Sequence, residues 1–200
     1  TLVGGCISLM VGFIAATVAA IVGTIYGAIS GYLGKRTDNF MMRIVDILYA
    51  LPYMFLVIII VTAIEDVPVS SIFDPLNFVS RKLFGLEIFE GKLIILFFVL
   101  GFVGWLTTAR IVRGQVLSLK EQEFVLASRS LGVRGWQIIF RHLIPNALGP
   151  IIVYFTLTVP SMIMQEAFLS FIGLGVQPPN PSLGSLINDG ANQMNSYWWI

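Results

Sequence analysis

Long apolar stretches separated by shorter charged ones dominate the chain. Asp, Glu, Lys and Arg are absent from residues 1–34, 47–64, 93–109 and 143–165. A helix needs roughly 20 mostly apolar residues to cross the hydrocarbon core of a bilayer, so this pattern predicts transmembrane helices. We place these spans at about 6–33, 44–64, 92–112 and 146–168, with another span beginning near residue 197.

The charged connections between the spans predict their orientation. The first connection carries Lys35, Arg36 and Arg43, and the segment 110–142 has six Lys or Arg residues against two Glu residues. Lys and Arg are enriched in cytoplasmic loops, so we expect both connections to face the cytoplasm. The two remaining connections are acidic or nearly uncharged, and we expect them outside, as an external insertion at 65–91 and an external loop at 169–196.

Composition supports a membrane protein. The 200 residues are 56% hydrophobic and 12% charged, with a mean hydropathy of +0.87, whereas a soluble domain is about 25% charged. This excludes an ordinary water-soluble domain, and the net charge of +1 gives no reason to expect a nucleic-acid partner. Because the chain starts at Thr1 and stops inside an aromatic cluster, we interpret it as a fragment.

Small residues recur at every fourth position of the first predicted span. Such a stripe lets another helix approach closely within lipid. Packing inside this subunit and packing against another subunit are both open. The stripe consists of Ala15, Ala19, Gly23, Gly27 and Gly31.

Two prolines and two carboxylates mark a possible pathway or gate. Pro52 and Pro160 lie in predicted spans, where each removes a backbone donor and can bend the helix, although membrane helices also tolerate proline. Asp46 and Glu166 lie near span margins, where ionisable groups suggest a pathway or gate. Alternatively, both are interfacial, with Asp46 close to Arg43 and Glu166 reaching outside water.

Motifs for catalysis or metal binding are missing from the sequence. Cys6 is the only cysteine and His142 the only histidine, which excludes intrachain disulfides and multi-cysteine or histidine-rich metal sites. Gly34-Lys35 does not end a phosphate-binding loop, because Ile29 and Arg36 replace the required glycine and hydroxyl residues. We expect no catalytic residue, metal or cofactor in this chain.

The basic segment before the last full span is the most informative. Apolar residues recur there at helical spacing on both sides of Gly132 and Gly135, a pattern that predicts a helix, a bend and a second helix. A cytoplasmic segment of this kind either lies on the membrane surface or docks into a cleft on a partner protein.

This segment resembles the cytoplasmic loop of bacterial ABC-importer permease subunits. The family pattern is E-A-A, three residues, Gly, nine residues, Ile, any residue and Leu-Pro. The positions that match are Ala127, Ser128 (in place of the second alanine), Gly132 and Pro145. The positions that depart are Leu126, His142 and Ile144. The segments MRIVDILYALP (42–52) and EAFLSFIGLGVQPP (166–179) are similar to the oligopeptide, dipeptide and nickel branch of that family.

The resemblance implies an all-α, polytopic transmembrane bundle of the type I ABC-importer permease fold, with about five of six spans present here. It implies a bacterial inner-membrane subunit for short peptides, with a homologous second permease, two cytoplasmic ATPase subunits, an extracytoplasmic substrate-binding protein and membrane lipid as partners. A coupling loop at 113–145 would dock on an ATPase through Glu123, Ala127, Ser128, Arg129, Gly132, Trp136 and Pro145. A nickel or other small-solute permease, and an ion-gradient-driven secondary transporter, are the alternatives.

Overall fold

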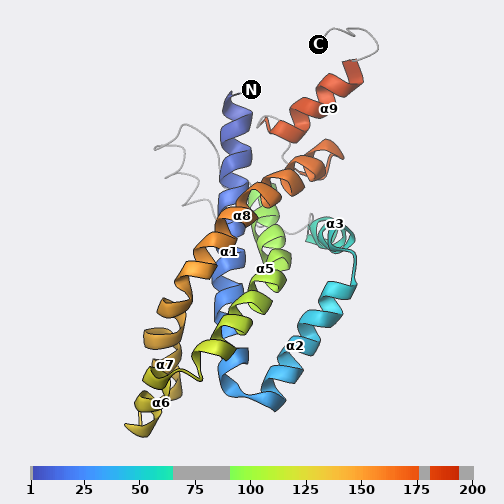
Figure 1. Cartoon of the computed structure of the whole chain (residues 1–200). Coiled ribbons are helices and arrows are strands. Elements are labelled where there is room, and N and C mark those ends of the chain that lie inside the picture. The colour runs from blue at the N-terminus through green and yellow to red at the C-terminus, as the bar shows by residue number, and fades with distance from the viewer. Residues whose placement is uncertain (1, 65–90, 176–180, 194–200) are drawn as a thin grey trace. The chain divides into compact units, whose positions relative to one another are not determined.

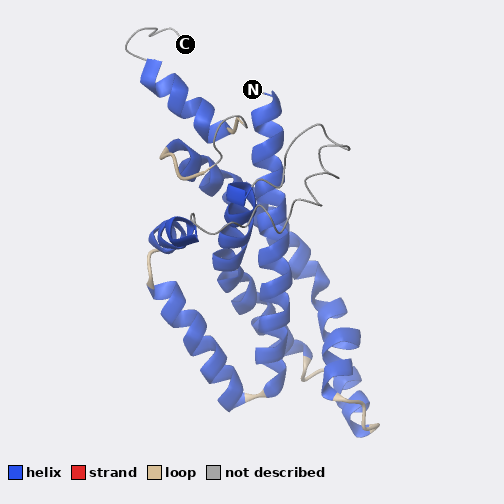
Figure 2. Ribbon diagram, turned by 180° about the vertical axis from the view of Figure 1, so that it is seen from behind, coloured by secondary structure: helices blue, strands red, loops and turns tan. Residues whose placement is uncertain are grey.

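The computed structural model describes residues 2–64, 91–175 and 181–193, and every regular element within them is helical (Figures 1 and 2). This confirms the all-α prediction. The expected insertion at 65–91 (except Gly91) and the span near residue 197 lie outside the described residues. The elements are α1 (Leu2–Leu33), α2 (Lys35–Ala50), α3 (Tyr53–Ile64), α5 (Gly91–Leu119), α6 (Glu123–Ser130), α7 (Gly135–Ile138), the π-helical turn η1 (Ile139–Leu143), α8 (Ile144–Phe171) and α9 (Leu183–Gln193).

Three stretches of described helix are long and apolar enough to cross a membrane. They are Leu2–Leu33, Leu96–Leu119 and Gly135–Phe171. The pair α2 and α3 makes a fourth if it is counted as one broken span. The described helices therefore fit a multi-pass membrane protein.

The helix is broken at Pro52 inside the predicted span at 44–64, where the proline was expected to allow a bend. α2 already begins at Lys35 and ends at Ala50, and Leu51 is extended, with φ −78° and ψ 139°. The ring of Pro52 disfavours helical geometry in the residue before it, which explains the break at this point. Pro160 behaves differently, because α8 continues through it as one helix from Ile144 to Phe171.

The chain divides into two compact units, which we describe separately. The first unit is drawn from Thr1–Ala16, Met54–Gly101 and Val159–Ile200. The second unit is drawn from Thr17–Tyr53 and Phe102–Thr158.

In the second unit, the small-residue stripe of α1 packs against α5. A Cβ added at Gly23 would lie 2.8 Å from the Trp105 carbonyl oxygen, and one at Gly31 would lie 3.1 Å from the Arg113 carbonyl oxygen. Close backbone approach of this kind is what small residues permit in membrane helix pairs. For these glycines the structure decides between the two open alternatives, because they serve packing inside the chain.

Gly27→Ala is expected to destabilise the second unit by about 1–3 kcal/mol, because the new Cβ would overlap the Ala109 carbonyl oxygen of α5 and a packed helix pair accommodates extra volume poorly. Gly114→Ala is the matched control on α5, since nothing lies within 4 Å of its added Cβ. Alanine there is expected to stabilise the helix by about 0.5–1 kcal/mol. Thermal unfolding of the two variants in detergent compares them, and equal effects would contradict the packing explanation.

In the first unit, α9 is docked on the ends of α1 and α8. Ser182 and Ser185 cap α9 reciprocally, each accepting a hydrogen bond from the other's backbone N–H through its hydroxyl oxygen, at 3.2 and 2.8 Å. The Leu183 N–H donates to the Ser8 hydroxyl of α1 at 3.1 Å. Part of the predicted external loop at 169–196 is therefore a helix that is hydrogen-bonded to α1.

Candidate functional site

The connection between α5 and α8 contains most of the residues that the family resemblance singles out. It folds as α6, a turn, α7 and η1, which confirms the predicted helix, bend and helix. We call residues 120–143 the α5–α8 connection. The start predicted at residue 113 is wrong, because α5 continues to Leu119, with Val112 and Val116 fully buried on its inner face.

Gly132 makes the bend of the connection. Its φ is +75°, in the left-handed region that favours glycine. The Gly132 N–H donates to the Arg129 carbonyl at 2.9 Å, and the Val133 N–H donates to the Ser128 carbonyl at 3.1 Å. These two bonds form a Schellman cap, which ends α6 and satisfies its last carbonyls.

One face of the α5–α8 connection is anchored in a hydrophobic core of the second unit. Burial of a large apolar side chain contributes about 1.5–3 kcal/mol, so this core fixes the connection firmly. A displacement of the connection would therefore be passed to the helices that share the core. The connection contributes Val125, Ile138, Ile139 and Leu143, and the helices contribute Ala28, Val112, Val116, Ala147 and Ile151.

Several large apolar side chains of the α5–α8 connection remain exposed. Leu131 at the turn is 83% exposed and Trp136 at the start of α7 is 61% exposed. The Trp136 and Phe140 rings lie 4.3 Å apart, centroid to centroid. We call this surface, which also includes Phe124 and Leu126, the exposed apolar face. Exposed large apolar side chains on a charged segment are candidates for contact with a partner.

The other predicted loop residues lie on α6 and its turn. Glu123 and Ala127 are exposed, which leaves them accessible to a partner. The Ser128 hydroxyl donates to the Phe124 carbonyl at 2.8 Å, and Arg129 places its guanidinium carbon 4.9 Å from the Tyr32 ring centroid. Arg129 therefore makes a contact inside the chain in addition to being exposed.

Pro145 stands apart from α6, as the second residue of α8. It has no N–H and cannot complete the helical hydrogen bond to the Arg141 carbonyl. The preceding turn is π-helical, and the Ile144 N–H donates to the Ile139 carbonyl, five residues earlier. The wider π turn is the local adjustment through which the chain enters α8.

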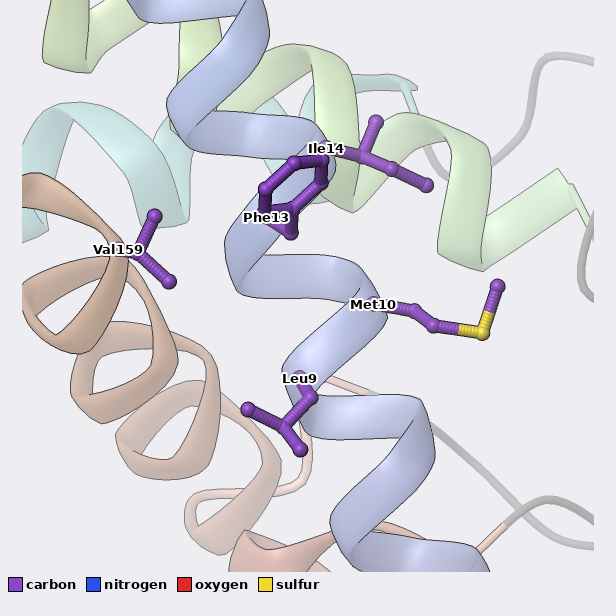
Figure 3. Close-up of a pocket in the computed structure, with 5 residues that line it drawn as sticks. All are labelled: Leu9, Met10, Phe13, Ile14 and Val159. Carbon is purple, nitrogen blue, oxygen red and sulfur yellow. The ribbon is translucent and has the colours of Figure 1, made fainter. Parts of the chain in front are cut away.

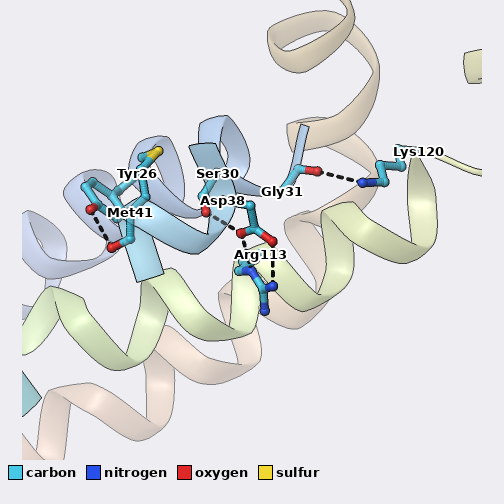
Figure 4. A network of polar contacts seen from close by, with 7 residues as sticks. All are labelled: Tyr26, Ser30, Gly31, Asp38, Met41, Arg113 and Lys120. Atoms are coloured by element: carbon cyan, nitrogen blue, oxygen red, sulfur yellow. Dashed lines mark hydrogen bonds and ion pairs between the residues drawn. The ribbon is translucent and has the colours of Figure 1, made fainter. Parts of the chain in front are cut away.

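A polar network joins α1, α2 and α5 beside the connection (Figure 4). The Asp38 carboxylate is buried and accepts hydrogen bonds from Arg113 Nε at 2.5 Å and Nη2 at 2.6 Å. The Ser30 hydroxyl donates to the same carboxylate at 2.7 Å. Two parallel bonds from a guanidinium are the strong form of this interaction, so α2 and α5 are firmly paired here.

Asp46, a predicted pathway residue, forms an exposed ion pair. Its carboxylate lies 2.8 Å from Arg110 Nη2 of α5, and the two side chains are 64% and 39% exposed. The same guanidinium lies 4.2 Å from the Tyr49 ring centroid. The sequence offered Arg43 one turn earlier, but it could not show that α5 lies next to α2 and supplies Arg110 as a partner.

Glu166, the second predicted carboxylate, is fully buried in the first unit. The Ser170 hydroxyl donates to one of its oxygens at 2.6 Å, and the other oxygen has no hydrogen-bond partner in the described structure. The alternative that placed Glu166 in outside water is therefore wrong. Isolated buried carboxyl groups are costly, and within membrane proteins they usually serve a function.

The pairing of Asp38 with Arg113 is not apparent from the sequence. The two residues are 75 positions apart, and no local pattern in either segment indicates that they are in contact. The available signal was one carboxylate within a basic connection, which needs a partner if it becomes buried.

An apolar cavity in the first unit is lined by Leu9, Met10, Phe13, Ile14 and Val159 (Figure 3). Its walls offer no charged group for recognising a polar ligand. Groups of three or more potential metal ligands do not occur among the described residues.

Known proteins are similar in sequence to this chain over most or all of its length. The model of the family of binding-protein-dependent transport system inner membrane components matches residues 23–200. The chain is 47% identical over 200 residues to the oligopeptide transport system permease protein OppC of Haemophilus influenzae, covering all of this chain and 56% of that protein. It is 46% identical to OppC of Escherichia coli K12, covering 99% of this chain and 57% of that protein.

The similarity also extends to a protein named for dipeptides. The dipeptide transport system permease protein DppC of Bacillus subtilis is 42% identical over 200 residues, which cover all of this chain and 55% of that protein. The chain thus spans little more than half the length of the curated relatives it matches.

Proposed function

Because the chain belongs to the family of binding-protein-dependent transport system inner membrane components, we propose that it forms part of the membrane pathway of an ATP-driven importer for short peptides. The family is one of transport components and not of enzymes. ATP hydrolysis is therefore assigned to separate subunits. The observation that carries the proposal is the α5–α8 connection, with one face anchored in the core and large apolar side chains exposed.

The exposed apolar face is proposed to dock in a groove on a cytoplasmic ATPase subunit. Trp136 and Leu131 would supply the buried contacts, since large apolar and aromatic side chains dominate binding energy at interfaces. Glu123 and Arg129 would lie at the polar rim, and Ala127 and Ser128 would allow close approach. Gly132 would hold the bend between the docked helices, and Pro145 would direct the chain into α8.

The remaining partners follow from the type of system. A binding-protein-dependent importer requires an extracytoplasmic protein that delivers the ligand, and we propose one here. A homologous second permease would complete the pathway, two ATPase subunits would drive it, and the assembly would lie in the bacterial inner membrane. The names of the relatives, which include both oligopeptide and dipeptide systems, favour short peptides over nickel or another small solute.

Movement of the docked connection would be converted into a change of access in the membrane. The connection shares its core with α1, α5 and α8, so closure of the ATPase subunits would shift these helices together, as a hinge or shear transition. The break at Pro52 and the proline at position 160 would allow neighbouring helices to repack.

The test is uptake by vesicles that contain the full-length permease and its partners. Labelled di- and tripeptides are expected to accumulate with ATP present and the proton gradient collapsed by an ionophore, and the ATPase subunits are expected to co-purify with the permease. Uptake that follows the ion gradient without ATP would instead support the secondary transporter. Competition by nickel but not by peptides would overturn the substrate class.

Glu166 is proposed as a gate residue on the external side. Glu166→Gln keeps an acceptor for the Ser170 hydroxyl and removes the ionisable group, so folding is expected to persist while uptake falls roughly tenfold or more, as for an essential polar contact. Asp46→Asn changes the other marginal carboxylate, which is exposed, and is expected to have less effect on uptake. Native uptake by Glu166→Gln would exclude the gate role.

A further inference from the structure

An aromatic ring lies between the inner surface of the α5–α8 connection and the end of α1. Tyr32 is next to the last residue of α1 and packs against the core that anchors the connection. A Cβ added at Gly135 would lie 2.8 Å from Tyr32 Cε1 and 3.1 Å from its hydroxyl oxygen. The ring therefore lies directly on the backbone at the start of α7.

The same ring also contacts the other helix of the connection. The Arg129 guanidinium carbon lies 4.9 Å from the Tyr32 ring centroid, within the range of a cation–π interaction. Arg129 belongs to the last turn of α6. Tyr32 thus contacts the connection on both sides of the bend at Gly132, once through a side chain and once through the backbone.

This double contact matters because α1 is not joined to the connection by the chain. α5 and α8 continue directly into it and must follow any movement of its ends. The end of α1 is held to the connection by non-covalent contacts, which include the Lys120 Nζ donation to the Gly31 carbonyl at 3.1 Å (Figure 4). Tyr32 contacts both α6, through Arg129, and the start of α7, at Gly135.

We propose that Tyr32, which packs against the backbone of Gly135, is the positioning residue that transmits movement of the α5–α8 connection to α1. This inference rests on the proposed docking of the connection on an ATPase. The Ser30–Asp38–Arg113 network then carries the displacement from the end of α1 to α2 and α5. Tyr32 contacts neither ATPase nor substrate in this arrangement and acts through the connection.

The test measures ATP hydrolysis and peptide uptake together, in the full complex reconstituted with its binding protein. Tyr32→Ala is expected to co-purify with the ATPase subunits at the native ratio while peptide transported per ATP hydrolysed falls roughly tenfold, a usual size of coupling between sites. Tyr32→Phe keeps the ring and is expected to restore coupling. Leu33→Ala is the matched control, because the side chain of this neighbouring residue is 55% exposed. The substitution should leave the coupling ratio at the native value.

Gly135→Ala tests the contact between Tyr32 and the Gly135 backbone without removing the Tyr32 ring. Its Cβ displaces Tyr32, so uncoupling is expected, and the double variant with Tyr32→Ala should lose no more than Tyr32→Ala alone. Such non-additivity is the signature of two residues that act through one contact.

The outcomes separate this inference from the proposed function. An assembled Tyr32→Ala complex with native coupling would overturn the role of Tyr32 while leaving the docking proposal in place. If Tyr32→Ala does not assemble, Gly135→Ala decides by the same ratio, with native coupling overturning the inference and uncoupling supporting it. Failure of the native permease to bind ATPase subunits would overturn the proposed function itself.

Discussion

Replacing Gly132 by proline is expected to abolish co-purification of the permease with its ATPase subunits. Proline fixes φ near −65°, whereas Gly132 has φ +75° and donates its N–H to the Arg129 carbonyl. The substitution therefore removes the cap of α6 and changes the direction of the chain into α7. A loss of about 3 kcal/mol or more corresponds to a fall of roughly a hundredfold in the population that presents the exposed apolar face correctly.

Gly132→Asn is the matched variant for this experiment, because asparagine adopts the left-handed region more readily than other residues with a side chain. An added Cβ at this position meets nothing within 4 Å, so the comparison isolates backbone conformation from steric overlap. We expect Gly132→Asn to retain most of the ATPase binding. Equal binding by Gly132→Pro and the native protein would contradict the coupling role of the bend.

Asp38→Asn is expected to lower the free energy of unfolding of the second unit by about 3 kcal/mol, the lower end of the cost of breaking a buried ion pair. The Arg113 guanidinium would keep its charge and lose a carboxylate that it contacts through two nitrogens. Equilibrium unfolding in mixed micelles measures the difference. Arg113→Lys should lose part of the same energy, because an ammonium cannot reproduce the two parallel bonds.

The chain supplies a matched control for this prediction on the same two helices. Asp46→Asn breaks the pair with Arg110, whose side chains are 64% and 39% exposed, compared with 8% and 31% for Asp38 and Arg113. Exposed pairs contribute about 0–1 kcal/mol, so Asp46→Asn should be nearly neutral for stability. Similar losses in the two variants would show that burial does not determine the strength of these pairs.

The sequence predicted what depends on local composition. Uninterrupted apolar runs located the spans because each must satisfy its backbone within itself. The bend at Gly132 was predictable because a glycine between two helical patterns is a common helix terminator. The Pro52 break was foreseen only as a possible bend, since a proline alone does not tell whether a helix kinks or ends.

What depends on tertiary contacts was not predictable from the sequence. The extension of α5 beyond residue 112 depends on the burial of Val112 and Val116 and on the ion pair between Arg113 and Asp38. The sequence of this charged segment shows neither the burial nor the ion pair. Likewise, Glu166 is followed by the polar residue Ser170 one turn later, and only the packed structure shows that both side chains are buried.

The contact between the glycines of α1 and the carbonyls of α5 also restricts how these two helices can move. Advancing α1 by one residue along its axis would shift it by about 1.5 Å and rotate the contacting position by about 100°. A step in one direction would put Val22 and Tyr26, and a step in the other Thr24 and Ala28, where Gly23 and Gly27 now leave no room for a Cβ. Sliding of the two helices past each other at these glycines is therefore opposed within the second unit.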